Sequence, residues 1–329
     1  MKKRNVGILG AGNIANYMAN TLVHMDAVVP YAVAAREKER AEGFAARYGI
    51  QKAYGSYREM IGDPAVDLIY IATPHSHHAE HMRQCLEGGK HVLCEKAFTS
   101  TAKEAREVFA LAKQKGLLVT EAIWPRYMPM ARTIRDFLAS GKIGKIHSMT
   151  CNLGYPVAHV KRLREPSLAG GALLDVGVYT MHFASLVMGN DVKDVASAAV
   201  MNEKGVDLQG CAALTYGGGR MANVFFSVLC ATDRIGAIHG EEGYALIGNI
   251  NNFEYLRVYN RDHELIEETL RAPQITGFEY EVRAAMDAIE RGALECAEAT
   301  HADTLFVMEL MDSIRHGWGM WYPWETRDI

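Results

Sequence analysis

The sequence predicts an α/β fold in its N-terminal part, followed by an α+β domain with a large, open and mostly antiparallel sheet. The chain has 329 residues, roughly twice the ~150 residues of a typical domain. Up to about residue 122, short β-branched runs alternate with helix-like runs, which is typical of a doubly wound parallel sheet. From residue 123, long alternating runs follow one another with few helices between them, which favours antiparallel pairing. We therefore expect two domains, 1–122 and 123–329.

The first domain is predicted to contain five strands with helices between them. The expected strands are Asn5–Leu9, Val28–Ala34, Asp67–Ala72, His91–Cys94 and Leu117–Thr120. The helical periodicity lies in Glu37–Tyr48, His77–Glu87 and Thr101–Lys115. Thr101 is followed by Glu104 at the capping-box spacing, in which each side chain pairs with a free backbone N–H at a helix start. Local signals and the alternating pattern therefore agree.

The second domain is predicted to contain six strands and three helices. The expected strands are Lys145–Leu153, Val195–Val200, Gly210–Tyr216, Arg220–Cys230, Gly243–Ile247 and Glu254–Tyr259. The expected helices are Gly171–Met188, Phe278–Arg291 and Ala302–His316. Because no linker of distinctive composition separates the domains, the boundary near Glu121–Pro125 follows only from this change of pattern.

The composition narrows the classes of function. Hydrophobic residues make up 49% and charged residues 22%, which is typical of a globular chain, and no apolar run reaches the ~18 residues of a membrane span. The formal net charge of -4 argues against nucleic acid as a partner. The six cysteines are scattered, and glycine interrupts the N-terminal apolar run before it reaches signal-peptide length. We expect a cytoplasmic protein that acts on small molecules.

The first predicted strand leads directly into Gly10-Ala11-Gly12-Asn13-Ile14-Ala15, which matches the dinucleotide-binding pattern G-x-G-x-x-G/A. Gly10 permits the tight turn, Gly12 removes a Cβ that would block a pyrophosphate, and Ala15 lets the helix pack on the strand. The helix start, with Asn13 and Ile14, offers free N–H groups to the phosphates. An ordinary glycine turn is the alternative, but the strand–turn–helix setting favours a dinucleotide.

The second strand ends in Val33-Ala34-Ala35-Arg36, without the acidic residue that accepts a hydrogen bond from the ribose 2′-hydroxyl of NAD. A guanidinium can pair with a 2′-phosphate, whereas a carboxylate would repel it. Arg36 therefore favours NADP over NAD, although a solvated arginine at a helix start is the alternative.

Four segments together resemble the Gfo/Idh/MocA oxidoreductases. They are Gly10–Ala15, Ile71-Ala72-Thr73-Pro74-His75-Ser76-His77-His78, Gly89-Lys90-His91-Val92-Leu93-Cys94-Glu95-Lys96 and Gly170-Gly171-Ala172-Leu173-Leu174-Asp175-Val176-Gly177-Val178-Tyr179. The resemblance extends over essentially the whole chain. Trp124, Arg126 and the combination of Asp175 with Tyr179 are most similar to the dimeric dihydrodiol dehydrogenase and glucose–fructose oxidoreductase branch.

This resemblance implies that Lys96, Asp175 and Tyr179 are catalytic. The family motif Glu-Lys-Pro appears here as Glu95-Lys96-Ala97, so the stiffening proline is absent after Lys96. Independently of the family, a lysine at the carboxyl end of a parallel strand points into the crevice where ligands bind. Asp175 and Tyr179 are four residues apart, so a helix would place both on one face, where a phenol can act as a proton donor. A surface lysine and a polar helix face are the alternatives.

The resemblance also implies a set of cofactor and substrate residues. Those expected at the cofactor are Gly10, Gly12, Asn13, Ile14, Ala15, Arg36, Thr73, Pro74, His75, His78, Glu95 and Lys96, and those at the substrate are Trp124, Arg126, Asp175 and Tyr179. The histidines between His75 and His81 raise the question of a metal, but no cysteine or carboxylate of suitable spacing accompanies them, so no metal is expected. His182 has either a packing role or a place in the pocket.

We therefore expect a nicotinamide-dependent dehydrogenase or reductase, with NADP favoured and NAD possible, acting on CH–OH groups of a sugar, polyol or dihydrodiol. Two alternatives are a regulatory protein that senses dinucleotide without turnover and a glycoside hydrolase of the same fold that uses NAD.

The strand Arg220–Leu229 carries apolar residues on both alternations. Because an uncovered apolar sheet face favours aggregation, a homodimer or a dimer of dimers is expected at this face.

Overall fold

The computed structural model describes residues 3–325, which form two compact units. Unit 1 comprises the chain up to Tyr127 together with Gln274–Thr304, and unit 2 comprises Met128–Pro273 and the residues from Leu305 onward. The segment Gln274–Thr304 packs with the N-terminal unit, a return of the chain that the expected division into 1–122 and 123–329 did not include. The predicted fold class, a parallel sheet followed by a large and mostly antiparallel one, is confirmed.

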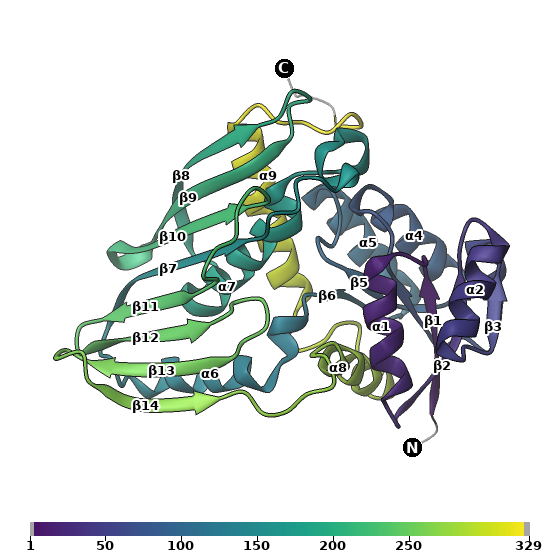
Figure 1. Ribbon diagram of the computed structural model, residues 1–329, viewed down its shortest axis with the longest axis horizontal. Coiled ribbons are helices and arrows are strands. Elements are labelled where there is room, and N and C mark those ends of the chain that lie inside the picture. Colours follow the sequence, from purple (N-terminus) through teal and green to yellow (C-terminus); the bar gives the residue numbers. More distant parts are fainter. Residues whose placement is uncertain (1–2, 326–329) are drawn as a thin grey trace. The chain divides into compact units, whose positions relative to one another are not determined.

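Unit 1 is built on a sheet of six parallel strands in the order β3-β2-β1-β4-β5-β6, which is the order of a dinucleotide-binding Rossmann sheet (Figure 1). The strands are β1 (Arg4–Leu9), β2 (Val28–Ala34), β3 (Lys52–Tyr54), β4 (Leu68–Ile71), β5 (His91–Glu95) and β6 (Val119–Ala122). The helices are α1 (Asn13–Val23), α2 (Lys38–Tyr48), α3 (Tyr57–Ile61), α4 (His75–Glu87), α5 (Ala102–Lys115), the short 3₁₀ turn η1 (Trp124–Tyr127) and α8 (Glu279–Glu290). The strand order reverses between β1 and β4, so ligands are expected beyond their carboxyl ends.

The sequence explains most of these boundaries. The helix start predicted at Thr101 is present, since Thr101 accepts a hydrogen bond from the N–H of Glu104 at 3.3 Å, while the Glu104 carboxylate accepts the N–H of Ser100 at 3.1 Å. Ser56 caps α3 in the same way, accepting the N–H of Glu59 at 3.3 Å. β4 and β6 are buried along their whole length, as strands covered on both faces must be. β3 was not predicted because three residues give no measurable alternation, and β6 begins two residues later than expected.

Unit 2 is built on eight strands in the order β14-β13-β12-β11-β7-β10-β9-β8, with only β7 and β10 parallel. The strands are β7 (Ile146–Gly154), β8 (Val192–Met201), β9 (Asp207–Tyr216), β10 (Arg220–Ser227), β11 (Gly236–Gly240), β12 (Gly243–Gly248), β13 (Tyr255–Asn260) and β14 (Leu265–Leu270). The helical segments are α6 (Pro129–Ser140), the 3₁₀ turns Lys161–Arg164, Pro166–Leu168 and Gly217–Gly219, the π-helical turn Leu173–Gly177, α7 (Val178–Met188) and α9 (His301–Gly317), which begins in unit 1.

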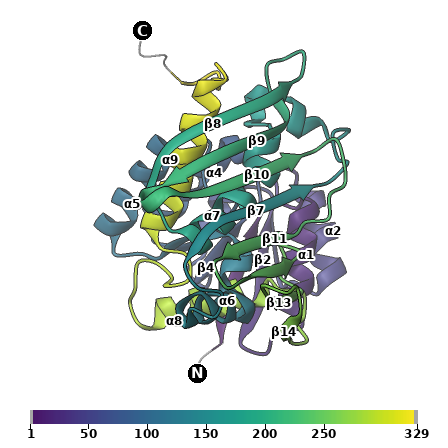
Figure 2. The same cartoon turned by 90° about the vertical axis from the view of Figure 1, so that its left-hand side faces the viewer.

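The two faces of the unit 2 sheet differ. α7 packs against β7 and β10, and Figure 2 shows β8, β9 and β10 in front with α7 behind them. Along β10, Val224 and Phe226 are buried toward the helix, whereas Met221 is 42% exposed on the other face. Val200 and Leu229 are also exposed. The expectation of one covered and one open face therefore agrees with the burial within unit 2.

Two strands and one helix of unit 2 were not predicted. β11 and β14 are short, and β11 begins and ends with glycine, which weakens any strand signal. α6 had readable signals, because Pro129 stands at its first position, Gly141 ends it at φ 68°, and Met130, Ile134 and Phe137 are buried at helical spacing.

One segment, Pro166–Met188, is long and apolar enough to cross a membrane by length and composition. The expectation that no such run exists is therefore wrong by that measure. Because 89% of the apolar window is buried inside the structure, a core helix accounts for it, and such a segment is weak evidence for a membrane span.

Candidate functional site

The loop after β1 has the geometry that the glycine pattern predicts. Gly10 adopts φ 106°, and a Cβ there would lie 2.8 Å from the carbonyl oxygen of Ala72, so only glycine fits. A Cβ at Gly12 would meet nothing within 4 Å and would project into open space at the start of α1. No side chain caps this helix start in the described structure. The first N–H groups of α1 and the space at Gly12 therefore suit the pyrophosphate of a dinucleotide.

Arg36 lies exposed directly after β2. Sequence reasoning missed a second arginine, Arg40, one helical turn further along, whose Nη2 donates to the carbonyl oxygen of Ala11 at 3.0 Å. Burial raises the pKa of Tyr57, and the positive charges of Arg36 and Arg40 oppose that rise. Two guanidinium groups and a phenol therefore lie near one another beside the glycine loop. The spacing of four residues was the available signal for Arg40.

Lys96 follows β5 and is half-buried, and its backbone N–H donates to Glu95 Oε2 at 3.2 Å. Glu95 is buried and accepts a short hydrogen bond from the hydroxyl of Tyr70. The peptide between Lys96 and Ala97 is cis. The lysine thus extends from a turn whose flanking groups are buried and hydrogen-bonded.

His78 holds this turn from the start of α4. Its two ring nitrogens lie 2.9 Å from the carbonyl oxygen of Ala97 and 2.8 Å from that of Thr73. Burial lowers the pKa of His78 in spite of these contacts. The ring therefore joins the loops after β4 and β5. This contact supports the turn at Lys96, where the family's stiffening proline is absent.

The other histidines of this segment do not gather around one point. His75 is buried and its ring meets that of His78 edge to face, with centroids 5.7 Å apart. Burial, followed by the charges of His77 and His78, lowers the pKa of His81 to about 4. Among the described residues, no group of three or more His, Cys, Asp or Glu side chains is arranged to hold a metal ion.

Trp124 and Arg126 are buried within unit 1. Trp124 stacks on Phe278 with ring centroids 4.8 Å apart, and the close approach of Gly277 at φ 104° leaves no room for a Cβ. Arg126 donates to the carbonyl oxygen of Glu298 and to Asp303, each at 3.0 Å. The assignment of Trp124 and Arg126 to the substrate stays a prediction.

In unit 2, Asp175 lies in the π-helical turn Leu173–Gly177 and Tyr179 in the first turn of α7. Both side chains are buried, at 7% and 8% exposure. Asp175 Oδ1 accepts a hydrogen bond from Arg162 Nη2 at 2.8 Å. Sequence reasoning missed Arg162, because nothing in its spacing from Asp175 indicates the contact. His182 is buried one turn beyond Tyr179.

Comparison with known proteins decides the family. A model described as "Oxidoreductase family, NAD-binding Rossmann fold" matches residues 4–123, and the GFO/IDH/MocA C-terminal domain matches residues 131–246. The chain is 32% identical to trans-1,2-dihydrobenzene-1,2-diol dehydrogenase of Mus musculus over 98% of each chain. It is 30% identical to the Homo sapiens protein of the same name over 90% of each chain. The chain belongs to the Gfo/Idh/MocA family of oxidoreductases.

Solved structures of related proteins agree with this assignment. A 3-ketoreductase from Actinomadura kijaniata, in complex with NADP and TDP-benzene, has a TM-score of 0.88 and 28% identity, covering 96% of this chain and 98% of that chain. The fold is also that of an aldose-aldose oxidoreductase from Caulobacter crescentus, with a TM-score of 0.86, 20% identity and coverage of 97% and 98%. This Gfo/Idh/MocA member is therefore an oxidoreductase with a nicotinamide-dinucleotide-binding domain, as predicted.

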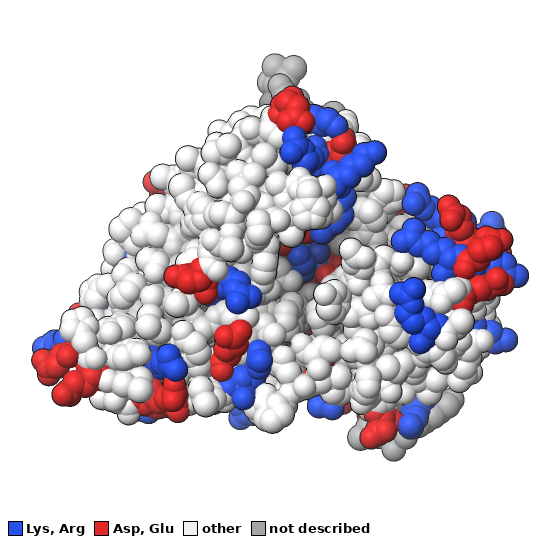
Figure 3. Space-filling view, viewed as in Figure 1, with Lys and Arg blue, Asp and Glu red and all other residues white. Residues whose placement is uncertain are grey.

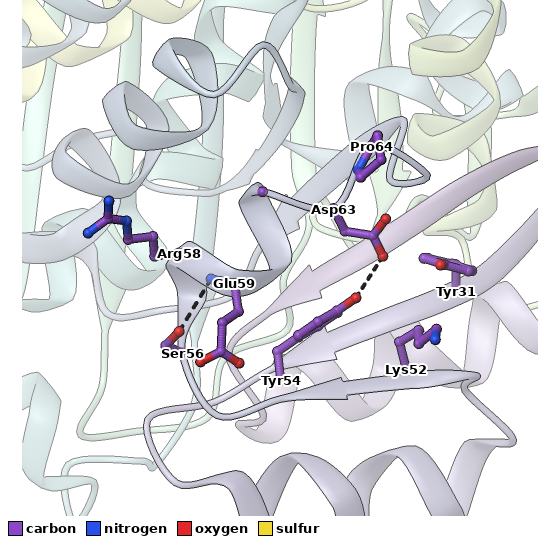
Figure 4. A pocket seen from close by; sticks show the side chains of 9 residues that line it. Tyr31, Lys52, Tyr54, Ser56, Arg58, Glu59, Asp63 and Pro64 are labelled. Atoms are coloured by element: carbon purple, nitrogen blue, oxygen red, sulfur yellow. Dashed lines mark hydrogen bonds between the residues drawn. The ribbon is translucent and has the colours of Figure 1, made fainter.

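A shallow pocket elsewhere in unit 1 does not include the predicted site residues. It lies at the β3 edge, and Figure 4 shows the side chains of Tyr31, Lys52, Tyr54, Ser56, Arg58, Glu59, Asp63 and Pro64 around it. Tyr54 donates to Asp63 Oδ2 at 2.6 Å, and Asp63 Oδ1 accepts the N–H of Ala65 at 2.8 Å. The hydrogen bond from Tyr54 holds the pKa of Asp63 below its usual value. Its central carboxylate is thus already paired, and we assign no function to the pocket.

Charge is distributed without a dominant sign on the face drawn in Figure 3. Lys and Arg are interspersed there with Asp and Glu, and uncharged residues cover most of the remaining surface. Among the described residues, several charged side chains are paired, such as Arg164 with Glu203 at 3.0 Å and Arg261 with Glu242 at 2.8 Å. This face therefore offers no extended basic surface to a polyanion.

Proposed function

We propose that this oxidoreductase uses NADP and interconverts a secondary alcohol and a carbonyl on a polyhydroxylated ring, such as a sugar, polyol or dihydrodiol. The observation that carries the proposal is the presence of Lys96 directly after β5, of Asp175 in the π-helical turn and of Tyr179 in α7. The relatives named dihydrodiol dehydrogenase support the substrate class. Arg36, with Arg40 beside it, supports NADP, since both offer guanidinium groups to a 2′-phosphate.

The proposed cofactor residues are the glycine loop with Asn13, Ile14 and Ala15, together with Arg36 and the groups that follow β4 and β5. When bound, the nicotinamide accepts or supplies the hydride. Gly12 and the first turn of α1 hold the pyrophosphate, and Arg36 pairs with the 2′-phosphate. Thr73, Pro74, His75, His78, Glu95 and Lys96 line the nicotinamide end in this proposal. Each of these assignments can be tested by its effect on dinucleotide affinity.

The chain's own residues would move the proton. In reduction, Tyr179 would donate its hydroxyl proton to the carbonyl oxygen, and Lys96 is proposed as the second group that handles this proton. In oxidation, the phenolate of Tyr179 would remove the proton from the alcohol. Asp175, which Arg162 holds at 2.8 Å, accepts a hydrogen bond from the substrate and orients it.

The test is turnover of a panel of aldoses, polyols and dihydrodiols, followed by the absorbance of NADPH. We expect Lys96→Ala and Tyr179→Phe each to lower kcat at least ~100-fold, the lower end of the contribution of a positioned acid–base group, with little change in NADPH affinity. Tyr244→Phe is the matched control, because Tyr244 stacks on Tyr259 in β13. Turnover within a few-fold of wild type in either variant removes that residue from the mechanism.

The same panel separates the two other functions. A dinucleotide-sensing regulatory protein would bind NADPH but turn over no member of the panel. A glycoside hydrolase would instead cleave glycosides and require NAD, which the arginines beside the glycine loop disfavour. Neither alternative involves hydride transfer between the nicotinamide and a free alcohol or carbonyl as its net reaction, so neither requires Lys96, Asp175 and Tyr179 together.

We further propose that the chain forms a cytoplasmic homodimer, or a dimer of dimers, through the open face of the unit 2 sheet. Val200, Met221 and Leu229 are 49%, 42% and 42% exposed there, and an apolar face of this kind is typical of an interface. Light scattering is expected to give at least twice the 36.4 kDa of one chain, and Met221→Glu is expected to lower that mass. A wild-type mass near 36.4 kDa would overturn the proposal.

A further inference from the structure

The helical segment that carries Asp175 and Tyr179 begins on a buried carboxylate. Asp207, the first residue of β9, is fully buried, and its Oδ2 accepts the N–H of Leu173 at 2.7 Å. Leu173 is the first residue of the π-helical turn, whose N-cap residue Ala172 supplies no side-chain acceptor. Since the first N–H groups of a helix lack partners within the helix, Asp207 satisfies one of them from a strand 34 residues away in sequence.

The backbone at Gly171 lies against the carboxylate of Asp207. Gly171 adopts φ 126°, and a Cβ at this position would lie 2.2 Å from Asp207 Oδ1. A side chain at residue 171 could be accommodated only if Asp207 moved away from the helix start. The absence of a side chain at Gly171 therefore gives Asp207 access to Leu173.

The C-terminal tail, residues 317–325, supports the same point. The hydroxyl of Tyr322 donates to the carbonyl oxygen of Gly170 at 2.9 Å, across 152 residues of sequence. Arg315, at 1% exposure, donates to Asp312 at 2.8 Å and to Glu325 Oε1 at 2.9 Å, and its guanidinium lies over the Tyr322 ring at 4.5 Å. The tail is thus anchored by a buried ion pair and ends against the residues that precede Leu173.

We propose that Asp207 is a positioning residue for Asp175 and Tyr179, acting through its hydrogen bond to Leu173, and that the C-terminal tail keeps this contact in place. The inference rests on the catalytic roles proposed above for Asp175 and Tyr179. In a π-helical turn the backbone hydrogen bonds span five residues rather than the four of an α-helix, so the direction of both side chains depends on how the turn is held at its start. Asp207 does not touch the reacting atoms and contributes only through the position of the helix.

The protonation of Asp207 gives this role a measurable signature. Burial raises the pKa of Asp207 to about 7, although the hydrogen bond from Leu173 and the charge of Arg315 oppose the rise. Two ionisable groups act on Asp207, namely Arg315 of α9 and Tyr322 of the tail, and Asp312 and Glu325 in turn act on Tyr322. Asp175 lies two residues beyond Leu173 and is paired with Arg162. An ionised carboxylate is a stronger acceptor than a neutral one, so Leu173 is held more firmly above pH 7.

The experiment compares Asp207→Leu, which removes the acceptor, with Asp207→Asn, which keeps an oxygen but cannot ionise. Amide hydrogen exchange over residues 171–177 and kcat and KM between pH 6 and 8.5 are measured for both. In Asp207→Leu we expect exchange roughly 10-fold faster and kcat at least ~10-fold lower, with KM for NADPH changed less than about twofold. In Asp207→Asn we expect kcat to recover to within about threefold and the wild-type inflection near pH 7 to disappear. Asp262→Asn, in the exposed turn between β13 and β14, is the control for the loss of one charge.

Each contrary result has a defined meaning. Wild-type exchange in Asp207→Leu overturns the contact, and faster exchange with unchanged kcat overturns the positioning role. An inflection near pH 7 that persists in Asp207→Asn shows that another group titrates there and also counts against the proposal. Should Asp207→Leu fail to fold, Tyr322→Phe, which removes only the hydrogen bond to Gly170, must accelerate exchange over the same residues. Wild-type kcat in Tyr179→Phe would instead refute the proposed function, because exchange reports on Asp207 independently of turnover.

Discussion

Units 1 and 2 are each organised by one large sheet, but the two sheets hold the residues of the proposed site differently. In unit 1 the strands are parallel and β4 and β6 are buried throughout, so the glycine loop and Lys96 simply follow strand ends. In unit 2 the strands alternate between buried and exposed positions, and Asp175 and Tyr179 lie on a helical segment packed across the sheet. The proposed cofactor residues of unit 1 are therefore close together in sequence, whereas the proposed catalytic residues of unit 2 are supported by contacts that are distant in sequence.

Buried charge also distinguishes the units. In unit 2 the buried Arg315 is paired with Asp312 and Glu325. In unit 1, Glu281 of α8 is fully buried, and neither of its carboxylate oxygens has a hydrogen-bond partner among the described residues. Burial first, and then the nearby negative charges of Glu95, Glu121 and Glu279, raises the pKa of Glu281 well above its usual value.

The largest expected effect contrasts Glu281 with Glu279, two residues earlier on the same helix. The folded state binds the Glu281 proton more tightly than the unfolded state does, so this group's contribution is present at low pH and is lost as pH rises above about 4.5. Glu281→Gln should remove that loss, which amounts to as much as about 1.4 kcal/mol per pH unit over this range. Urea unfolding between pH 4.5 and 8 measures it, and equal pH slopes in wild type and variant would contradict the assignment.

Glu279 provides the control of opposite sign. Burial opposes its ionisation, but hydrogen bonds from the backbone of Thr276, Ile275 and Gly277 outweigh burial and lower its pKa. Its contribution is therefore present above its unfolded pKa and is lost as pH falls through the folded value. Glu279→Gln should destabilise unit 1 at neutral pH and differ least from wild type in acid.

The second prediction exchanges one glycine of each unit for alanine. Gly171→Ala should lower the free energy of unfolding by at least about 2 kcal/mol, because φ is 126° and the new Cβ would collide with Asp207. Gly12→Ala should leave stability within about 0.5 kcal/mol but weaken dinucleotide binding, since its Cβ enters the open space at the helix start. Urea unfolding and calorimetric titration with NADPH separate the two. The prediction is wrong if Gly12→Ala lowers the free energy of unfolding, or if Gly171→Ala weakens NADPH binding without lowering that free energy.

The third and smallest effect concerns Arg36. Arg36→Asp should weaken NADPH binding roughly tenfold, about 1.4 kcal/mol, and strengthen NADH binding, because a carboxylate repels the 2′-phosphate and accepts from a ribose hydroxyl. Arg132→Asp reverses a charge at a side chain that is 86% exposed in unit 2 and should change neither affinity. The cofactor assignment fails if titration calorimetry shows that the wild-type protein binds NAD more tightly than NADP.

The same contrast explains how far the sequence could predict the structure. The glycine loop, Arg36 and Lys96 were predicted because turn, strand end and cofactor group follow one another within a few residues. Arg40 lies one helical turn beyond Arg36, so the spacing of four residues was a local signal for it, although it was not predicted.

In unit 2 the spacing of Asp175 and Tyr179 was readable, but their supports were not. Arg162 contacts Asp175 from a 3₁₀ turn, Asp207 contacts Leu173 from a strand, and Tyr322 contacts Gly170 from the tail. No periodicity connects residues that are 34 or 152 positions apart. The one-sided sheet was predicted from apolar residues on both alternations, whereas β11 and β14 were missed because short edge or glycine-bounded strands give little pattern.

The path of the chain has a consequence for how this protein is made. The polypeptide leaves unit 1 after Tyr127, returns at Gln274 and leaves again after Thr304. While a ribosome is still translating, the Rossmann sheet can be complete to β6, yet α8 and the carboxylate of Glu281 are added only some 150 residues later. While most of unit 2 is being synthesised, the nascent N-terminal part of unit 1 therefore exposes the surface that Gln274–Thr304 covers in the finished protein. Release of a truncated chain near residue 273 should leave both units unfinished.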